Sequence, residues 1–200
     1  MYRKISTDLK TQMNLYDVVE IQLSSEKNCQ STNLDQHFPV SIVHADGTHL
    51  EGCGFIDRGS SPSFRFSPQK KGIWHWRVLE NDYGINNQEG ELIVTSARIG
   101  NRFLEHGAIE ISKDQRYFTH QDGTPFFWLG ESAWCTVQQS DEAGWEIYLS
   151  NRSALGFSAV QFNSLLNWEG TIPFQREPFP IVNGKPDLNQ YSIDFFQYLD

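Results

Sequence analysis

The sequence predicts an antiparallel β-sandwich followed by a strand–helix–strand unit. Residues 16 to about 119 contain short runs of alternating apolar and polar residues, separated by turn residues and without helical patterns between them. Near residue 120 the pattern changes to two apolar runs, FFWLG and FSAVQF, on either side of an amphipathic segment. Apolar strands joined by a helix are typical of parallel sheets. We therefore expect two different architectures in one chain.

The expected sandwich begins with Val19, Ile21 and Leu23, which alternate with polar residues as in a half-buried strand. The following runs are FPVSIVHA, which ends near the tight-turn dipeptide Asp46-Gly47, then THLEGCGFID, SFRFSP, GIWHWRVL and ELIVTSA. In two of these runs, aromatic residues occupy alternate positions, so we predict that they form the core: Phe64, Phe66, Trp74 and Trp76.

The second part begins with a turn at Asp122-Gly123 and the apolar run FFWLG. We expect Ser140 to be the N-cap of the following helix, with acidic residues in its first turn, and Gly156 to end it. Four residues fall near one face of this helix: Trp145, Tyr148, Leu149 and Leu155. The run FSAVQF follows as the second strand, which completes a βαβ unit.

The end of the chain adds little regular structure to this unit. Residues 163–186 are loop-like, and residues 187–200 predict the start of another helix. Because one βαβ unit and one helix cannot close a barrel or bury both faces, we expect the chain to be part of something longer.

Composition limits the partners and the chemistry. The net charge of −9 is spread along the chain, which argues against nucleic acid and anionic membranes as partners, and no apolar run approaches the ~18 residues of a membrane span. The six histidines and three cysteines lack metal-ligand spacing, so we expect no metal and no cofactor. Pairing of Cys29 with Cys53 stays open, as does the oligomeric state.

Several segments resemble the apiosidase-like glycoside hydrolases. YDVVEIQL, GFID-RG and FRFSP-x-x-x-G-x-W-x-W are similar to the β-sandwich domain that precedes the barrel in this family. RYFTHQDGTPFFWLGESAW and NRSALGFSAVQFN resemble the first strand, the helix and the second strand of the (β/α)8 barrel itself. The family usually has Asp where this chain has Glu131.

This resemblance implies hydrolysis of glycosidic bonds in side chains of plant cell-wall-type or related polysaccharides, with a carbohydrate as the partner. The family places its catalytic carboxylate pair on later barrel strands, so the resemblance implies that no catalytic residue lies in this chain. It also suggests a secreted or periplasmic protein if the N-terminus is incomplete. The given N-terminus has no signal peptide, and a complete chain would be cytoplasmic.

Active sites of (β/α)8 barrels lie at the carboxyl ends of the strands, where sugars need hydrogen-bonding groups and flat rings. The residues at these positions are Glu131, Ser132, Trp134, Gln161 and Asn163, with Trp168 and Glu169 in the next loop. Alternatively, Glu131 favours the N-terminus of the following helix, and Trp134 packs between helix and strand. A catalytic pairing of Glu131 with Glu169 is a further alternative.

We therefore expect an N-terminal tail at residues 1–15, an immunoglobulin-like sandwich at 16–104, and the opening β-α-β part of a truncated (β/α)8 barrel at 105–200. The alternative function is a non-catalytic module that binds carbohydrate or supports a neighbouring domain.

Overall fold

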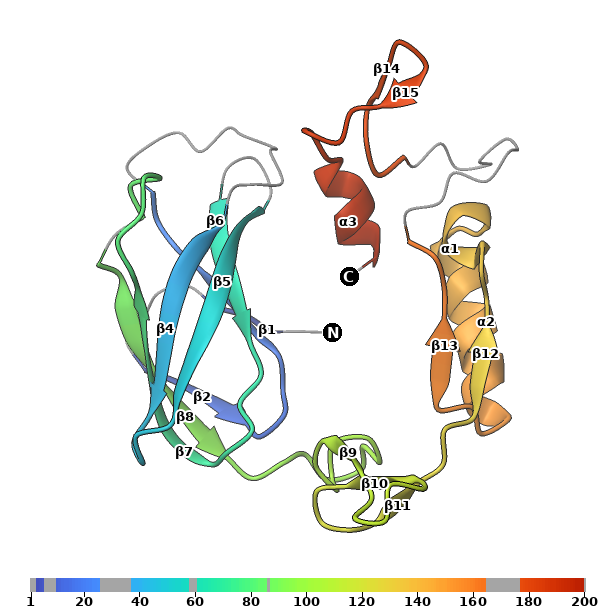
Figure 1. Ribbon diagram of the computed structural model, residues 1–200, viewed down its shortest axis with the longest axis horizontal. Helices are drawn as coiled ribbons and strands as arrows, with labels where there is room; N and C mark the ends of the chain where they lie inside the picture. The colour runs from blue at the N-terminus through green and yellow to red at the C-terminus, as the bar shows by residue number, and fades with distance from the viewer. Residues whose placement is uncertain are drawn as a thin grey trace. The chain divides into compact units, whose positions relative to one another are not determined.

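The computed structural model describes residues 3–5, 10–25, 37–57, 61–85, 87–164 and 177–199. Within these ranges the chain is mostly β with few helices (Figure 1). It divides into two compact units, residues 1–108 and residues 109–200, which are described separately.

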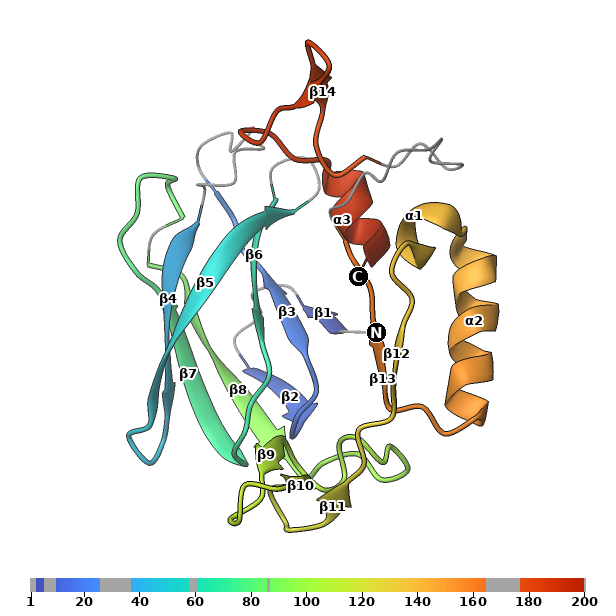
Figure 2. The same ribbon diagram turned by 45° about the vertical axis from the view of Figure 1, so that its right-hand side comes forward.

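The described strands of unit 1 form one eight-stranded sheet in the order β1-β3-β6-β5-β4-β7-β8-β2. The strands curve around a shared core (Figures 1 and 2). Their bounds are Arg3–Ile5 (β1), Lys10–Asn14 (β2), Val19–Gln22 (β3), Phe38–His44 (β4), His49–Asp57 (β5), Ser61–Phe66 (β6), Gly72–Val78 (β7) and Glu89–Thr95 (β8). The six predicted runs are therefore all strands.

The two edges of this sheet differ from the expected all-antiparallel arrangement. The pairs from β3 to β8 are antiparallel, but β1 pairs with β3 and β2 pairs with β8 in parallel. Lys10–Asn14, expected in an N-terminal tail, forms β2. It belongs to the sheet because Met13, only 6% exposed, packs into the core while the backbone pairs with β8.

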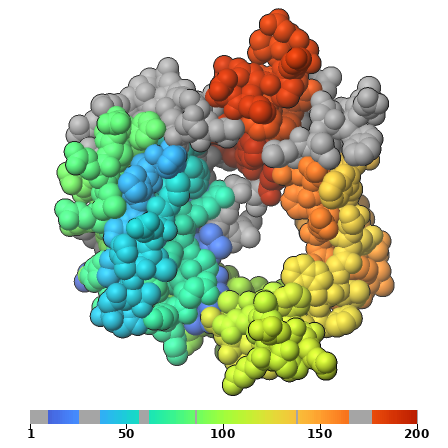
Figure 3. Space-filling model, in the orientation of Figure 1, coloured from blue at the N-terminus to red at the C-terminus, as the bar shows by residue number. Residues whose placement is uncertain are grey.

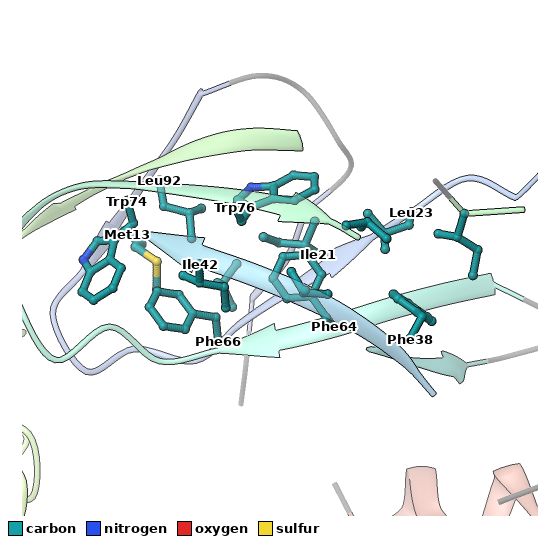
Figure 4. Packing of buried hydrophobic residues seen from close by; sticks show 14 of the residues in the cluster. Met13, Ile21, Leu23, Phe38, Ile42, Phe64, Phe66, Trp74, Trp76 and Leu92 are labelled. Atoms are coloured by element: carbon teal, nitrogen blue, oxygen red, sulfur yellow. The ribbon is translucent and has the colours of Figure 1, made fainter. Parts of the chain in front are cut away.

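The predicted aromatic core of unit 1 is confirmed. Phe64, Phe66, Trp74 and Trp76 are all buried (Figure 4). Their rings meet at an angle, with centroids 5.1 Å apart for Phe66 and Trp74 and 5.2 Å apart for Phe64 and Trp76. Alternation along β6 and β7 brings these rings to the inner face, where they pack with the aliphatic residues of the core.

Unit 2 contains short strands and three described helices. Its strands are Ile109–Ile111 (β9), Phe118–His120 (β10), Pro125–Phe126 (β11), Gly130–Ser132 (β12), Ala159–Gln161 (β13), Ile181–Val182 (β14) and Lys185–Pro186 (β15). Its helices are Thr136–Gln139 (α1), Glu142–Ala154 (α2) and Ile193–Leu199 (α3). The strands β12 and β13 pair in parallel, and α2 lies along them in both ribbon views (Figures 1 and 2).

The predicted parallel pairing is confirmed, but the first strand starts later than expected. Phe126, the first residue of FFWLG, ends the antiparallel strand β11, and β12 begins only at Gly130. The Asp122-Gly123 turn explains this difference, because it folds the preceding residues into a small hairpin in which His120 N donates to the Thr124 carbonyl at 2.8 Å.

At the ends of α2, the predicted N-cap is wrong and the predicted end at Gly156 is confirmed. The N-cap is Asp141, whose carboxylate accepts a hydrogen bond from Gly144 N at 2.8 Å, whereas the predicted cap Ser140 donates back to the Thr136 carbonyl of α1. Gly156 follows the helix with a φ of 88°, the left-handed conformation that ends many helices. Leu155 is 60% exposed and does not join the predicted apolar face.

Candidate functional site

The carboxyl ends of β12 and β13 bring four of the predicted site residues together. The register places Ser132 beside Gln161. Main-chain hydrogen bonds continue past the strands, from Ala133 N to the Gln161 carbonyl at 2.8 Å and from Asn163 N to the Trp134 carbonyl at 3.0 Å. Ser132, Trp134, Gln161 and Asn163 therefore lie at one edge of the parallel pair, where a hydroxyl, two amides and a ring are available.

Helix α2 covers one face of this strand pair. Glu131 of β12 forms an ion pair with Arg152 of α2, and Phe162, just after β13, makes an edge-on contact with Trp145 of α2. Because successive side chains along a strand point to opposite faces, Ser132 and Gln161 lie on the face that α2 leaves uncovered. We call this the uncovered face. Both residues are exposed.

Glu131 does not share the uncovered face with Ser132 and Gln161. Its Oε2 atom lies 3.1 Å from Arg152 Nε, and the Arg152 guanidinium lies over the ring of Tyr148, 5.3 Å from its centroid. Burial of the phenol raises the pKa of Tyr148, and the negative charge of Glu131 beside it raises the pKa further. The partner of Glu131 is thus in the last turn of α2, and not at the helix N-terminus.

Trp128 also lies on the uncovered face, which its position in an apolar run did not predict. A Cβ atom added at Gly130 would lie 2.9 Å from Nε1 of Trp128 and 3.8 Å from Cβ of Ala159. The indole therefore lies over Gly130, on the same face as Ala159 and, by alternation, Ser132 and Gln161. It is 56% exposed, and only a residue without a side chain permits this approach.

Other site predictions lie outside the part of the chain that the structure describes. Trp168, Glu169 and Cys29 belong to the ranges that are left out. Among the described residues, no group of three or more His, Cys, Asp or Glu side chains is arranged to hold a metal ion. No helix in the described ranges is long and apolar enough to span a membrane.

Unit 1 has a shallow depression of about 600 Å³ on the outer side of β4, β7 and β8. β4 and β5 reach the surface of this unit in the space-filling view (Figure 3). The charged side chains that line the depression form ion pairs with one another: Lys10 lies 3.1 Å from Glu91, and Arg77 lies 3.4 Å from Glu89. Among the described residues that line the depression, Trp76 is the one Phe, Tyr or Trp, and it is 4% exposed. A ring that deeply buried does not offer a surface for stacking a sugar.

Comparison with known proteins finds a family similarity for most of unit 2. Residues 112–200 match the sequence model of a family described as "Apiosidase-like, catalytic domain". This match covers less than half of the 200-residue chain. No curated protein matches the chain.

A solved structure described as a putative glycoside hydrolase from Bacteroides vulgatus ATCC 8482 has the same fold. It aligns with 94% of this chain at a TM-score of 0.73 and 21% sequence identity, and the chain spans 38% of that protein's length. Auracyanin B aligns with 46% of the chain and 88% of its own length at 12% identity, but its TM-score of 0.27 is too low to support an argument.

Proposed function

We propose that this chain is part of a glycoside hydrolase that acts on side chains of plant cell-wall-type or related polysaccharides. The match of residues 112–200 to the apiosidase-like catalytic domain supports this assignment, as does the fold shared with the Bacteroides protein. The observation that carries it is local. Two parallel strands end together at Ser132, Trp134, Gln161 and Asn163, where a barrel enzyme binds its substrate.

In this proposal the strand-end residues contact the sugar. Ser132, Gln161 and Asn163 exchange hydrogen bonds with hydroxyl groups, and the ring of Trp134, 41% exposed, packs against the C–H face of a sugar. Trp168 and Glu169, which lie outside the described residues, are proposed sugar contacts from the sequence alone. Hydrolysis requires two carboxyl groups at a fixed separation. We place that pair on later barrel strands, outside these 200 residues.

The proposed architecture gives each unit a separate role. Unit 1, with β1 and β2 included in its sheet, is an immunoglobulin-like sandwich domain, and residues 105–200 supply the first strand, helix and second strand of a (β/α)8 barrel. The division of the structure between residues 108 and 109 lies close to this boundary. The parallel β12–β13 pair with its intervening helices supports the barrel assignment, because parallel neighbours require a crossover connection.

The alternative is a non-catalytic module that binds carbohydrate through unit 1. Sugar-binding sheets offer exposed rings, but the aromatic side chains of β6 and β7 are buried and the charges of the outer depression pair with one another. The described residues therefore favour unit 2 as the carbohydrate-binding part. Binding of oligosaccharides to an isolated unit 1, unaffected by changes in unit 2, would reverse this preference.

A substitution series in the full product of the gene tests the proposed contact residues. Gln161→Ala and Ser132→Ala should each lower kcat/KM for the cleaved polysaccharide by about threefold to tenfold, the loss expected for one hydrogen bond. Glu146→Ala on the exposed side of α2 is the control and should change nothing. Unchanged kcat/KM in both strand-end variants would contradict the placement of the substrate.

A further inference from the structure

The Glu131 carboxylate belongs to a cluster built by α2 and the segment after it. Glu131 and Arg152 are only 31% and 29% exposed, and the atoms Glu131 Oε2, Arg152 Nε and Tyr148 Oη are buried. The Arg152 guanidinium lies over two rings, 5.3 Å from the centroid of Tyr148 and 5.6 Å from that of Phe157. Tyr148 and Arg152 are four residues apart and so share one face of the helix.

We propose that Glu131 is a positioning residue, and that its ion pair with Arg152 fixes the end of β12 so that Ser132 and Gln161 face the sugar. This inference rests on the proposed function for the identity of the ligand, a hydroxyl-rich carbohydrate. The geometry of the cluster itself does not depend on that function. We call Glu131, Arg152 and Tyr148 the Glu131 cluster.

The cluster acts on the site through the backbone of β12. Glu131 is the central residue of this three-residue strand, and Ser132 follows it directly. A carboxylate held from the α2 side fixes the orientation of the strand, and alternation then turns Ser132 to the opposite side. Immediately beyond, Ala133 N and Asn163 N donate the two hydrogen bonds that join the strand ends. These two amides are therefore the reporters of the proposed effect.

The groups around the Glu131–Arg152 ion pair indicate that its loss mainly affects the neighbouring residues. Arg152 is held over two rings, so it cannot follow a displaced Glu131 without losing both contacts. Replacing Glu131 by Gln leaves a half-buried guanidinium without a counter-charge, which is costly in proportion to its burial. The pKa of Tyr148 is raised, first by burial and then by Glu131, which places the carboxylate close to the phenol.

Amide hydrogen exchange in the 200-residue chain tests the proposal without a substrate. Glu131→Gln should accelerate exchange at Ala133 N and Asn163 N by about tenfold, because the strand ends open more often. Arg152→Lys, which keeps the charge but loses the planar contact with the rings, should give a smaller acceleration. Glu146→Gln, also on α2 but exposed, is the matched control and should leave both amides unchanged.

A second readout reports the cluster directly. The ultraviolet absorbance of Tyr148, obtained as the difference from Tyr148→Phe, should show ionisation at lower pH in Glu131→Gln than in the parent chain, since one cause of the raised pKa is removed. In the full gene product, Glu131→Gln should raise KM more than it lowers kcat, with Arg152→Lys intermediate.

The outcomes separate this inference from the proposed function. Local acceleration at the two reporter amides, together with a full gene product that cleaves no polysaccharide, would support the positioning role and defeat the glycoside hydrolase assignment. Unchanged exchange in Glu131→Gln would overturn the positioning role, even in an active enzyme. Equal acceleration throughout unit 2 would also overturn it, because it would show general destabilisation.

Discussion

Arg152 Nε lies 3.1 Å from Glu131 Oε2, and this contact joins the last turn of α2 to the centre of β12. Glu131 lies on the α2 side of the strand pair, opposite the face that carries Ser132 and Gln161. A residue selected as a sugar contact from its position after an apolar run thus has a protein partner. Its charge is used within the fold, and the strand-end surface is left to uncharged polar groups and tryptophan rings.

Removal of a core ring should reduce the stability of unit 1 sharply. Trp74→Ala should lower the free energy of unfolding by roughly 3–5 kcal/mol, because the ring is 1% exposed and packs against Phe66. Ile73→Ala in the same strand is the control, since Ile73 is 41% exposed. Denaturant unfolding monitored by circular dichroism measures both. Equal losses would show that the faces of β7 are reversed.

A methyl group at Gly54 should not fit beneath Phe38. A Cβ atom there would lie 2.0 Å from the ring of Phe38, which is 0% exposed and cannot move aside. Gly54→Ala should therefore cost about 1–3 kcal/mol through overpacking. Gly52→Ala, where the nearest atom is Ile42 Cδ1 at 3.1 Å, should cost less. The melting temperatures of the two variants measure this difference. A Gly54→Ala variant more stable than the Gly52→Ala variant would contradict the packing of Phe38 against Gly54.

The N-cap of α2 should contribute measurably to unit 2. Asp141→Ala removes the acceptor for Gly144 N and should lower the free energy of unfolding by about 0.5–2 kcal/mol. Asp141→Asn retains an acceptor oxygen and should lose only part of this. Ser140→Ala tests the sequence-based alternative directly. Greater destabilisation by Ser140→Ala than by Asp141→Ala would restore Ser140 as the more important residue.

The Asp46 turn should make unit 1 sensitive to acid. Hydrogen bonds from Thr48, then contacts with His44 and Lys70, hold the pKa of Asp46 well below the ordinary value of 3.8 for an aspartate. A depressed folded-state pKa stabilises the protein above the unfolded-state pKa, and this contribution is lost as the pH falls below about 4. Asp46→Asn should therefore be less stable at neutral pH and show a flatter decline in acid.

The measurement is the denaturant midpoint followed from about pH 6 to about pH 2. Glu51→Gln, an exposed carboxylate of the same hairpin, is the control. A decline in Asp46→Asn as steep as in the parent chain would show that other groups cause the acid sensitivity.

The sequence predicted the strands of unit 1 well because alternation and turn chemistry are local signals. In the run GIWHWRV, the alternate apolar residues Trp74, Trp76 and Val78 indicate the buried face. It did not predict β2, because pairing of Lys10–Asn14 with β8 joins segments far apart in the chain. It also placed a strand at FFWLG, because an apolar run does not reveal where a preceding hairpin ends.

The candidate site was predicted in position but not in orientation. Ser132, Trp134, Gln161 and Asn163 meet because the ends of parallel strands lie at one edge. Which side chains of a strand face the helix depends on the strand register, because a shift of one residue moves every side chain to the opposite face. Arg152, which forms the ion pair with Glu131, is about 20 residues away in sequence, and no local pattern indicates that pairing.

The central claim is that these 200 residues carry part of a sugar site but not the catalytic carboxylates. Its most direct test is sugar release from pectic and hemicellulosic polysaccharides, and from aryl glycosides, by the purified chain and by the full product of its gene. The account predicts release by the full product and none by the chain, since both glycosidase mechanisms need two positioned carboxyl groups. Hydrolysis by the 200-residue chain that is lost in Glu131→Gln or Glu169→Gln would contradict it.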